Sequence, residues 1–115
     1  MTALRILFVE DNDLVRSSLA RVLRRGGHEV VACGSAEAAL VEIERKTPFD
    51  LMITDFDLGH ATSDALLVEV RQRHPGTRVM LLTGTPRVRL PEGIRYIAKP
   101  IAAAELLRVI LPDAA

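Results

Sequence analysis

Residues 4–11 read Leu-Arg-Ile-Leu-Phe-Val-Glu-Asp, an apolar run that ends in two carboxylates. Large apolar side chains fill Leu4–Val9 too densely for a strand with one face in water, so this run predicts a strand buried on both faces of a parallel sheet. Glu10 and Asp11 then stand at its carboxyl end. Open parallel sheets build their sites at that edge. The stretch therefore predicts both the fold class and the place of a site.

The same arrangement recurs further along the chain. Apolar runs end in a reactive residue at three more places: Asp55 after Leu51–Thr54, Thr83 after Arg78–Leu82, and Lys99-Pro100 after Arg95–Ala98. If each run is a buried strand, these side chains gather at one edge of the sheet. Three carboxylates beside a lysine suggest a divalent cation and a phosphoryl group.

Longer amphipathic runs separate the apolar ones, which is typical of βα units around a parallel sheet. Glu29–Cys33 completes a predicted set of five strands. The pattern predicts helices over Asp13–Arg25, Ala36–Lys46, Asp64–Arg73 and Ala102–Leu111. Gly26-Gly27 should end the first helix, and Ser35 should cap the second. We therefore expect a doubly wound α/β domain.

One unit departs from the pattern. Gly84, Pro86, Pro91 and Gly93 lie between Thr83 and Lys99, in a segment with few apolar residues. Proline and glycine leave room for a turn or two of helix at most. We expect the fourth helix to be shortened or largely irregular.

The bulk properties indicate one globular domain over residues 1–115, with no effector domain. Fifteen basic residues balance fifteen acidic ones, so no strong field favours nucleic acid. Cys33 is the lone cysteine and is expected to be a buried thiol, while His28, His60 and His74 are expected at the surface or in caps. The first residues do not resemble a signal peptide, and no apolar run is long enough to span a bilayer. These features predict a cytoplasmic protein that does not insert into membranes.

The acidic residues predict a metal centre. First and third strands are neighbours in a right-handed doubly wound sheet, which would place Glu10, Asp11 and Asp55 side by side. Three such charges cannot all stay ionised without a cation, and Mg²⁺ prefers oxygen ligands. A carboxylate at a strand tip can attack phosphorus to form an acyl phosphate, with Lys99 pairing to the phosphoryl oxygens.

Four segments together resemble the receiver domain of two-component response regulators. They are Val9-Glu10-Asp11-Asn12, Ile53-Thr54-Asp55-Phe56-Asp57-Leu58, Leu81-Leu82-Thr83-Gly84 and Tyr96-Ile97-Ala98-Lys99-Pro100. The chain looks most similar to receivers of hybrid histidine kinases or to single-domain regulators. The resemblance implies a flavodoxin-like sheet with strand order 2-1-3-4-5.

The resemblance also implies roles for the site residues. Asp55 would be the phosphoacceptor, and Mg²⁺ would be bound by Asp11, Asp55 and the backbone carbonyl of Asp57, with help from Glu10. Thr83 would hydrogen-bond the phosphoryl group and Lys99 would form an ion pair with it.

Further roles follow from the same family pattern. Tyr96 would turn inward when Thr83 moves, as an aromatic switch. Asp57 and Thr85 would tune the loss of the acyl phosphate, and the bond before Pro100 would be cis.

A receiver of this kind takes its phosphoryl group from a histidine kinase or a histidine phosphotransfer protein, and catalyses only its own phosphorylation and dephosphorylation. The downstream target stays unknown, and the usual receiver dimer through the fourth helix is in doubt because that unit is short. One alternative is a pseudo-receiver, a protein-binding module that is never phosphorylated. A small α/β phosphatase or flavin-binding domain is a further alternative.

Overall fold

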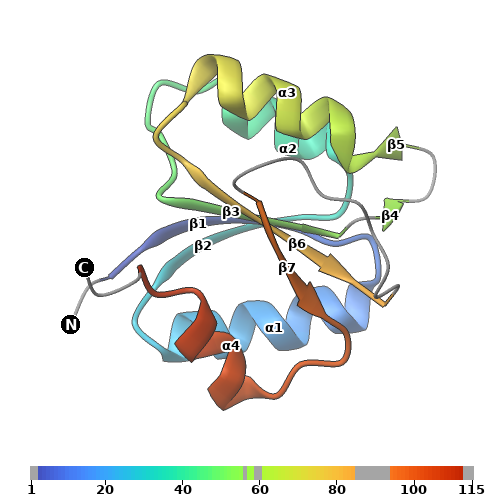
Figure 1. Cartoon of the computed structure of the whole chain (residues 1–115), viewed down its shortest axis with the longest axis vertical. Coiled ribbons are helices and arrows are strands. Elements are labelled where there is room, and N and C mark those ends of the chain that lie inside the picture. The colour runs from blue at the N-terminus through green and yellow to red at the C-terminus, as the bar shows by residue number, and fades with distance from the viewer. Residues whose placement is uncertain (1–2, 56, 59–60, 85–93, 113–115) are drawn as a thin grey trace.

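Five parallel strands form the central sheet of the structure, a computed structural model that describes residues 3–55, 57–58, 61–84 and 94–112 (Figure 1). The strands lie in the order β2-β1-β3-β6-β7. Their bounds are Arg5–Val9 for β1, Glu29–Cys33 for β2, Leu51–Asp55 for β3, Arg78–Thr83 for β6 and Arg95–Ala98 for β7. In sequence order of the sheet strands this is 2-1-3-4-5, so the predicted flavodoxin-like topology is confirmed.

Helices cover both faces of the sheet. Figure 1 shows α1 (Asp13–Arg25) and α4 (Ala103–Val109) on one face, with α2 (Ala36–Ile43) and α3 (Ser63–Arg73) on the other. Side chains of a strand alternate between its faces, so β1 sends Leu7 to the α2/α3 layer and Phe8 to the α1/α4 layer. The sheet is thereby buried on both sides.

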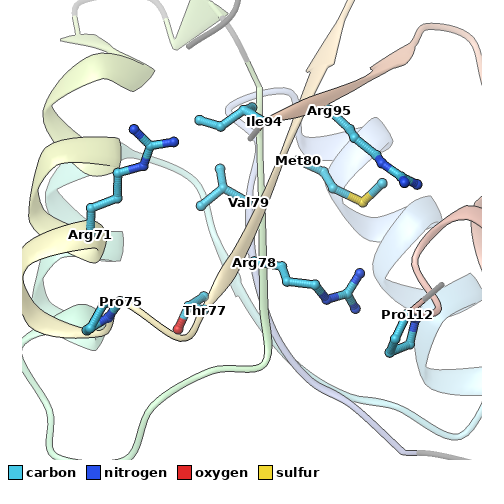
Figure 2. Close-up of a pocket in the computed structure, with 9 residues that line it drawn as sticks. All are labelled: Arg71, Pro75, Thr77, Arg78, Val79, Met80, Ile94, Arg95 and Pro112. Carbon is cyan, nitrogen blue, oxygen red and sulfur yellow. The ribbon is translucent and has the colours of Figure 1, made fainter. Parts of the chain in front are cut away.

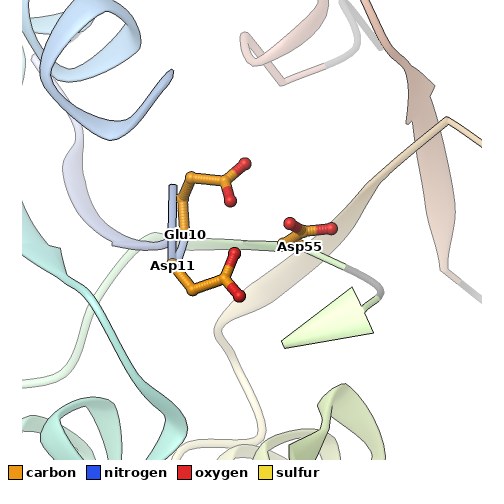
Figure 3. Close-up of side chains that lie close together, drawn as sticks. All are labelled: Glu10, Asp11 and Asp55. Carbon is orange, nitrogen blue, oxygen red and sulfur yellow. The ribbon is translucent and has the colours of Figure 1, made fainter. Parts of the chain in front are cut away.

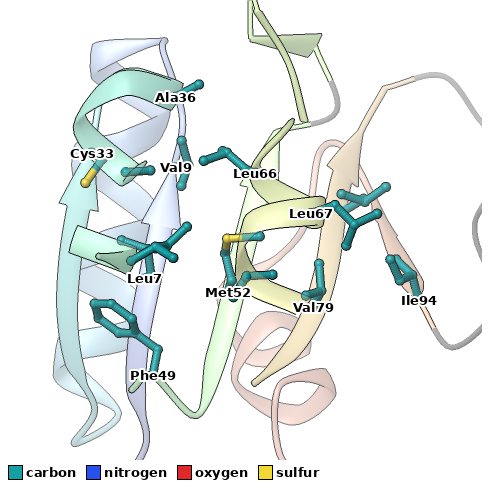
Figure 4. Packing of buried hydrophobic residues seen from close by; sticks show 14 residues of the cluster. Leu7, Val9, Cys33, Ala36, Phe49, Met52, Leu66, Leu67, Val79 and Ile94 are labelled. Atoms are coloured by element: carbon teal, nitrogen blue, oxygen red, sulfur yellow. The ribbon is translucent and has the colours of Figure 1, made fainter. Parts of the chain in front are cut away.

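Two apolar layers hold the elements together. Figure 4 shows the layer between the sheet and α2/α3, where Met52 and Val79 of the strands meet Leu66 and Leu67 of α3. All five residues of β3 are buried. Each fully buried aliphatic side chain contributes roughly 1.5–3 kcal/mol relative to exposure. The central strands are therefore the most firmly held part of the fold.

The helix starts follow local chemistry. The Asn12 side chain accepts a hydrogen bond from the Val15 amide, and Ser35 accepts one from the Ala38 amide, as predicted for Ser35. Gly27 has a φ of 93°, the left-handed backbone that glycine adopts without a Cβ clash, and α1 ends there as expected.

Two helices are shorter than the sequence predicted. α2 stops at Ile43, whereas a helix to Lys46 was expected. Ile43 is the last residue of that helix facing the core, and Glu44, Arg45 and Lys46 are exposed, so no packing extends the helix. α4 covers Ala103–Val109, within the expected Ala102–Leu111, because Ala102 is extended and supplies no side-chain cap.

A short antiparallel hairpin was not predicted. β4 (Asp57–Leu58) pairs with β5 (Ala61–Thr62) directly after β3. Strands of two residues are too short to show a period in the sequence. The expected irregular fourth unit concerns residues 85–93, which lie outside the described residues, as does His60.

The expectation for His28 was wrong. Its ring is buried, and Nδ1 accepts a hydrogen bond of 3.0 Å from the Leu4 amide, so it is a core residue. The half-buried His74 places Nε2 2.8 Å from the Ile43 carbonyl oxygen, at the end of α2. Cys33 is buried as predicted, and burial raises the pKa of its thiol. Among the described helices none is long and apolar enough to cross a membrane.

Candidate functional site

The three predicted carboxylates meet at the carboxyl ends of β1 and β3. Val9, the last residue of β1, pairs with Thr54 of β3, so Glu10 and Asp55 follow on neighbouring strands. One carboxylate oxygen from each of Glu10, Asp11 and Asp55 lies within 4.8 Å of the other two (Figure 3). The topology thus produces the acidic cluster that the sequence predicted.

Burial differs sharply within this cluster. Glu10 is 0% exposed and Asp55 is 5% exposed, while Asp11 is open to solvent. Glu10 Oε2 accepts a hydrogen bond of 3.1 Å from the Asn12 amide. Two carboxylates are therefore fixed in the protein interior and the third faces incoming solutes.

Lys99 reaches both buried carboxylates. Its Nζ lies 2.9 Å from Asp55 Oδ2 and 3.0 Å from Glu10 Oε1. The contact with Asp55 is a hydrogen bond, whereas the contact with Glu10 is an ion pair without hydrogen-bond alignment. One ammonium thus bridges the ends of β1 and β3 from β7.

Burial and mutual repulsion disfavour the charged forms of the clustered carboxylates. Burial raises the pKa of Glu10, and its neighbour Asp55 raises it further. Burial alone would lower the pKa of Lys99, but Asp55 and Glu10 stabilise the charged ammonium and the pKa of Lys99 is raised. Three carboxylates face one lysine here, so a further cation would relieve the repulsion.

The donor set fits a hard divalent cation. All the available ligand atoms are carboxylate oxygens, which Mg²⁺ and Ca²⁺ prefer. Two oxygens on opposite sides of one Mg²⁺ are about 4.2 Å apart for bonds of about 2.1 Å, so small side-chain movements would bring the cluster into range. Glu10 Oε1 accepts no hydrogen bond within the described part of the chain and is held there by its ion pair of 3.0 Å with the Lys99 ammonium.

The remaining predicted residues lie on β6 and β7. Thr83 ends β6, is buried, and accepts a hydrogen bond of 2.8 Å at its carbonyl from the Lys99 amide. Tyr96 lies on the edge strand β7 and is 44% exposed. The Lys99-Pro100 peptide bond is cis. Asp57 lies in β4, and its metal and tuning roles stay predictions; Thr85 lies outside the described residues.

An apolar groove adjoins Lys99. It has a volume of about 310 Å³ and lies between α1 and the segment after β7, where Leu14 and Leu19 face Pro100 and Ile101. Leu14 is 80% exposed, an unusual exposure for a large apolar side chain beside a charged site. A solute approaching Asp55 along this side would meet the groove first.

A different cavity, of about 350 Å³, lies near the amino ends of β6 and β7, away from the carboxyl ends that carry the acidic cluster (Figure 2). Three arginines contribute to its lining: Arg71 from α3, Arg78 from β6 and Arg95 from β7. Guanidinium groups do not ligate Mg²⁺, because they carry donors only. This cavity is therefore unrelated to the acidic cluster.

A family model for the response regulator receiver domain matches residues 6–111. The chain belongs to this receiver family. Receivers of this family take phosphoryl groups from histidine kinases, and phosphorylation with Mg²⁺ is typical of them.

Individual receivers agree with this assignment. The response regulator protein FleR of Pseudomonas aeruginosa is 38% identical over 114 residues, which cover 94% of this chain and 24% of FleR. The receiver domain of the hybrid histidine kinase CckA is 35% identical with a TM-score of 0.80, over 92% of this chain and 94% of that one. The receiver chain therefore spans about a quarter of the length of FleR.

A further structural neighbour bears on the metal. A response regulator protein from Burkholderia pseudomallei contains a phosphorylated aspartic acid, a calcium ion and citrate. It superposes with a TM-score of 0.82 at 25% identity, over 93% of this receiver chain and 66% of that chain.

Sequence reasoning gave no role to two residues that support the receiver site. The Asn12 amide fixes the Glu10 carboxylate, and Arg16 donates to the Glu10 carbonyl oxygen at 2.9 Å. The spacing of Asp13 and Arg16, three residues apart in the first turn after the acidic pair, is the one signal that could have indicated Arg16.

Proposed function

We propose that this receiver accepts a phosphoryl group on Asp55 from the phosphohistidine of a histidine kinase or a histidine phosphotransfer protein, with Mg²⁺ bound by Glu10, Asp11 and Asp55. The observation that supports this most directly is the position of Asp55. Its carboxylate lies within 4.8 Å of oxygens of Glu10 and Asp11 and accepts a hydrogen bond of 2.9 Å from the Lys99 ammonium. A nucleophile that adjoins both a cation site and a lysine is suited to phosphoryl transfer.

The residues divide the chemistry between them. A carboxylate oxygen of Asp55 attacks phosphorus while the phosphorus–nitrogen bond breaks, and the electron pair leaves on the donor imidazole. A bound Mg²⁺ supplies positive charge that offsets the phosphoryl oxygens and the neighbouring carboxylates. Lys99, already 2.9 Å from Asp55, follows the phosphoryl group as an ion-pair partner. The acyl phosphate stays on the protein, so the receiver is a substrate of the transfer that assists its own modification.

Thr83 and Tyr96 are proposed to carry the response. Thr83 ends the strand beside Asp55, since Asp55 pairs with Leu82. A phosphoryl group on Asp55 offers acceptors for the Thr83 hydroxyl, and movement of Thr83 opens space on the side of β7. Tyr96, which is 44% exposed, would turn inward into that space. Phosphorylation would then shift an equilibrium between two states of this face.

The phosphodonor is proposed to be a protein that docks on the groove beside Lys99. Lys99 lines the groove and also contacts Asp55, so a donor that reaches Asp55 covers this surface. The exposed Leu14 gives such a donor an apolar contact at the rim. We further propose that residues 1–115 act as one receiver domain in the cytoplasm, where histidine kinases present their phosphohistidines.

The proposal is tested by incubation with Mg²⁺ and a small acyl phosphate, followed by intact mass measurement. Wild-type protein should gain one phosphoryl group and Asp55→Asn should gain none. Equal modification of both proteins would end the proposal. If Asp55→Asn and Lys99→Ala both bound the partner as wild type does, the chain would instead be a phosphorylation-independent interaction module.

A further inference from the structure

Arg16 is a side chain of α1 that reaches back to the end of β1. Its Nη1 donates to the Glu10 carbonyl oxygen at 2.9 Å, and its Nη2 donates to Asp13 Oδ1 at 2.6 Å. The side chain is 24% exposed, so the guanidinium is largely enclosed. Arg16 therefore contacts the main chain of a candidate metal ligand and lies outside the carboxylate cluster itself.

The surroundings of Arg16 hold it in one place. A Cβ added at Gly34 would lie 3.0 Å from Arg16 Nη1, so the guanidinium packs closely over the turn that follows β2. Asp13 binds the other nitrogen from the first turn of α1. The guanidinium thus joins the ends of β1 and β2 to the start of α1.

Glu10 is held at each of its polar groups. Its amide donates to the Cys33 carbonyl at 3.0 Å, and its carboxylate contacts the Asn12 amide and Lys99. Arg16 supplies the side-chain contact to the carbonyl. The two basic side chains lie at opposite ends of one residue, with Lys99 at the carboxylate and Arg16 at the carbonyl.

The Glu10 carbonyl matters because of the residue that follows it. The Glu10 carbonyl and the Asp11 amide form one planar peptide unit, so holding the oxygen fixes the plane from which Asp11 projects. Asp11 is exposed, so packing restrains its side chain less than it restrains those of Glu10 and Asp55. The orientation of Asp11 toward Glu10 and Asp55 thus depends on this peptide plane.

We infer that Arg16 is a positioning residue that sets the affinity of the acidic cluster for a divalent cation. This inference rests on the proposed metal site and adds a residue that acts through the main chain of Glu10 and Asp11. Two effects of removing Arg16 oppose each other. Loss of its positive charge would favour cation binding, and loss of the held peptide plane would disfavour it. Asp13 already offsets the charge of Arg16, so the loss of orientation is the larger effect.

Calorimetric titration of the whole chain with Mg²⁺ tests the inference. Arg16→Ala should bind Mg²⁺ about tenfold more weakly, the size of effect that groups orienting metal ligands usually have. Arg16→Lys should recover part of the loss, because an ammonium can still donate to the carbonyl. Arg21→Ala is the matched control, since it removes an exposed arginine of the same helix and should leave the affinity unchanged.

Phosphorylation by a small acyl phosphate separates positioning from general damage. The Mg²⁺ concentration needed for half-maximal rate should rise about tenfold in Arg16→Ala, while the rate at saturating Mg²⁺ stays near that of wild type. A merely structural loss would lower the plateau as well. Thermal unfolding in EDTA verifies that the variant is folded, and Asp13→Ala, which frees the guanidinium, should give a smaller shift in the same direction.

Asp11→Asn distinguishes a failure of the proposed metal site from a failure of the positioning role of Arg16. If Asp11→Asn keeps wild-type Mg²⁺ affinity, the proposed metal site is wrong. If Asp11→Asn loses Mg²⁺ while Arg16→Ala and Asp13→Ala both stay within about twofold of wild type, the metal site stands and the role of Arg16 is overturned.

Discussion

The two sides of the site are built differently. β1 and β3 are buried almost throughout; Glu10 directly follows β1 and Asp55 ends β3, and both are buried. β7 is an edge strand whose described residues are mostly exposed, and Lys99 at its end keeps 30% of its side chain in solvent. The comparison indicates that the acceptor and its cation ligands are held in place before a phosphoryl group arrives. The lysine and tyrosine side has room to respond.

The largest expected effect is a difference in unfolding free energy between variants of the two sides. Ile53→Ala on β3 should cost about 3 kcal/mol of unfolding free energy, because it empties a fully buried position in the central strand. Tyr96→Ala on β7 should cost only about 1 kcal/mol, because the residue is 44% exposed. Urea unfolding of both variants measures this. Equal costs would break the distinction between a fixed and a responsive side.

Lys99→Ala tests the charge that links the two sides. Phosphorylation by a small acyl phosphate should slow about 100-fold, the usual cost of removing a group that stabilises developing charge. Mg²⁺ affinity should be kept or raised, since a competing cation has left Glu10 and Asp55. Arg95→Ala, at the start of the same strand, is the matched control for the rate measurement. A Lys99→Ala rate within threefold of wild type would remove the lysine from the chemistry.

Leu14→Ser tests the groove on the responsive side. Transfer from a phosphorylated histidine phosphotransfer protein should slow about tenfold, as for loss of one apolar contact in an interface. Transfer from a small acyl phosphate should not change, since that donor needs no groove. Val68→Ser removes another exposed apolar residue on a distant helix and should alter neither rate. Slowing with both donors would contradict a docking role.

The smallest expected effect is a pH dependence on the fixed side. Burial, and then Asp55, raise the pKa of Glu10 above its ordinary value of 4.5. The folded state therefore holds this proton to higher pH than the unfolded state does. The resulting stabilisation is fully present below pH 4.5 and is lost as pH rises through the raised pKa.

Unfolding in EDTA at several pH values tests that sign. Wild type should lose stability relative to Glu10→Gln as the pH rises above 4.5, and Mg²⁺ should restore it in wild type alone. If the difference in unfolding free energy between the two proteins does not change with pH, the pKa of Glu10 is not raised in the folded state.

Much of this could be predicted from the sequence, for a physical reason. Short, dense apolar runs such as Leu51–Thr54, alternating with longer amphipathic runs, predict buried parallel strands, and polar residues at their carboxyl ends then share one edge of the sheet. That is why the sequence alone predicts that Glu10, Asp11 and Asp55 cluster at this edge, as they do in the structure. Their positions directly after the apolar runs are what predict this placement.

Contacts that depend on the tertiary fold could not be read in the same way. His28 looked like a surface residue because its partner, the Leu4 amide, is 24 positions away. Arg16 received no role from the sequence, because its bond to the Glu10 carbonyl forms only when α1 lies against β1. The end of α2 at Ile43 depends on where packing stops, which helix propensity does not set.

Locating the phosphoryl group on the chain tests the central claim most directly. The protein is phosphorylated with a small acyl phosphate and Mg²⁺, reduced with borohydride to convert an aspartyl phosphate into homoserine, and analysed by peptide mass spectrometry. The account predicts homoserine at position 55 only, and none when Mg²⁺ is removed by EDTA. Homoserine at position 11 or 57, or modification that does not need a divalent cation, would contradict it.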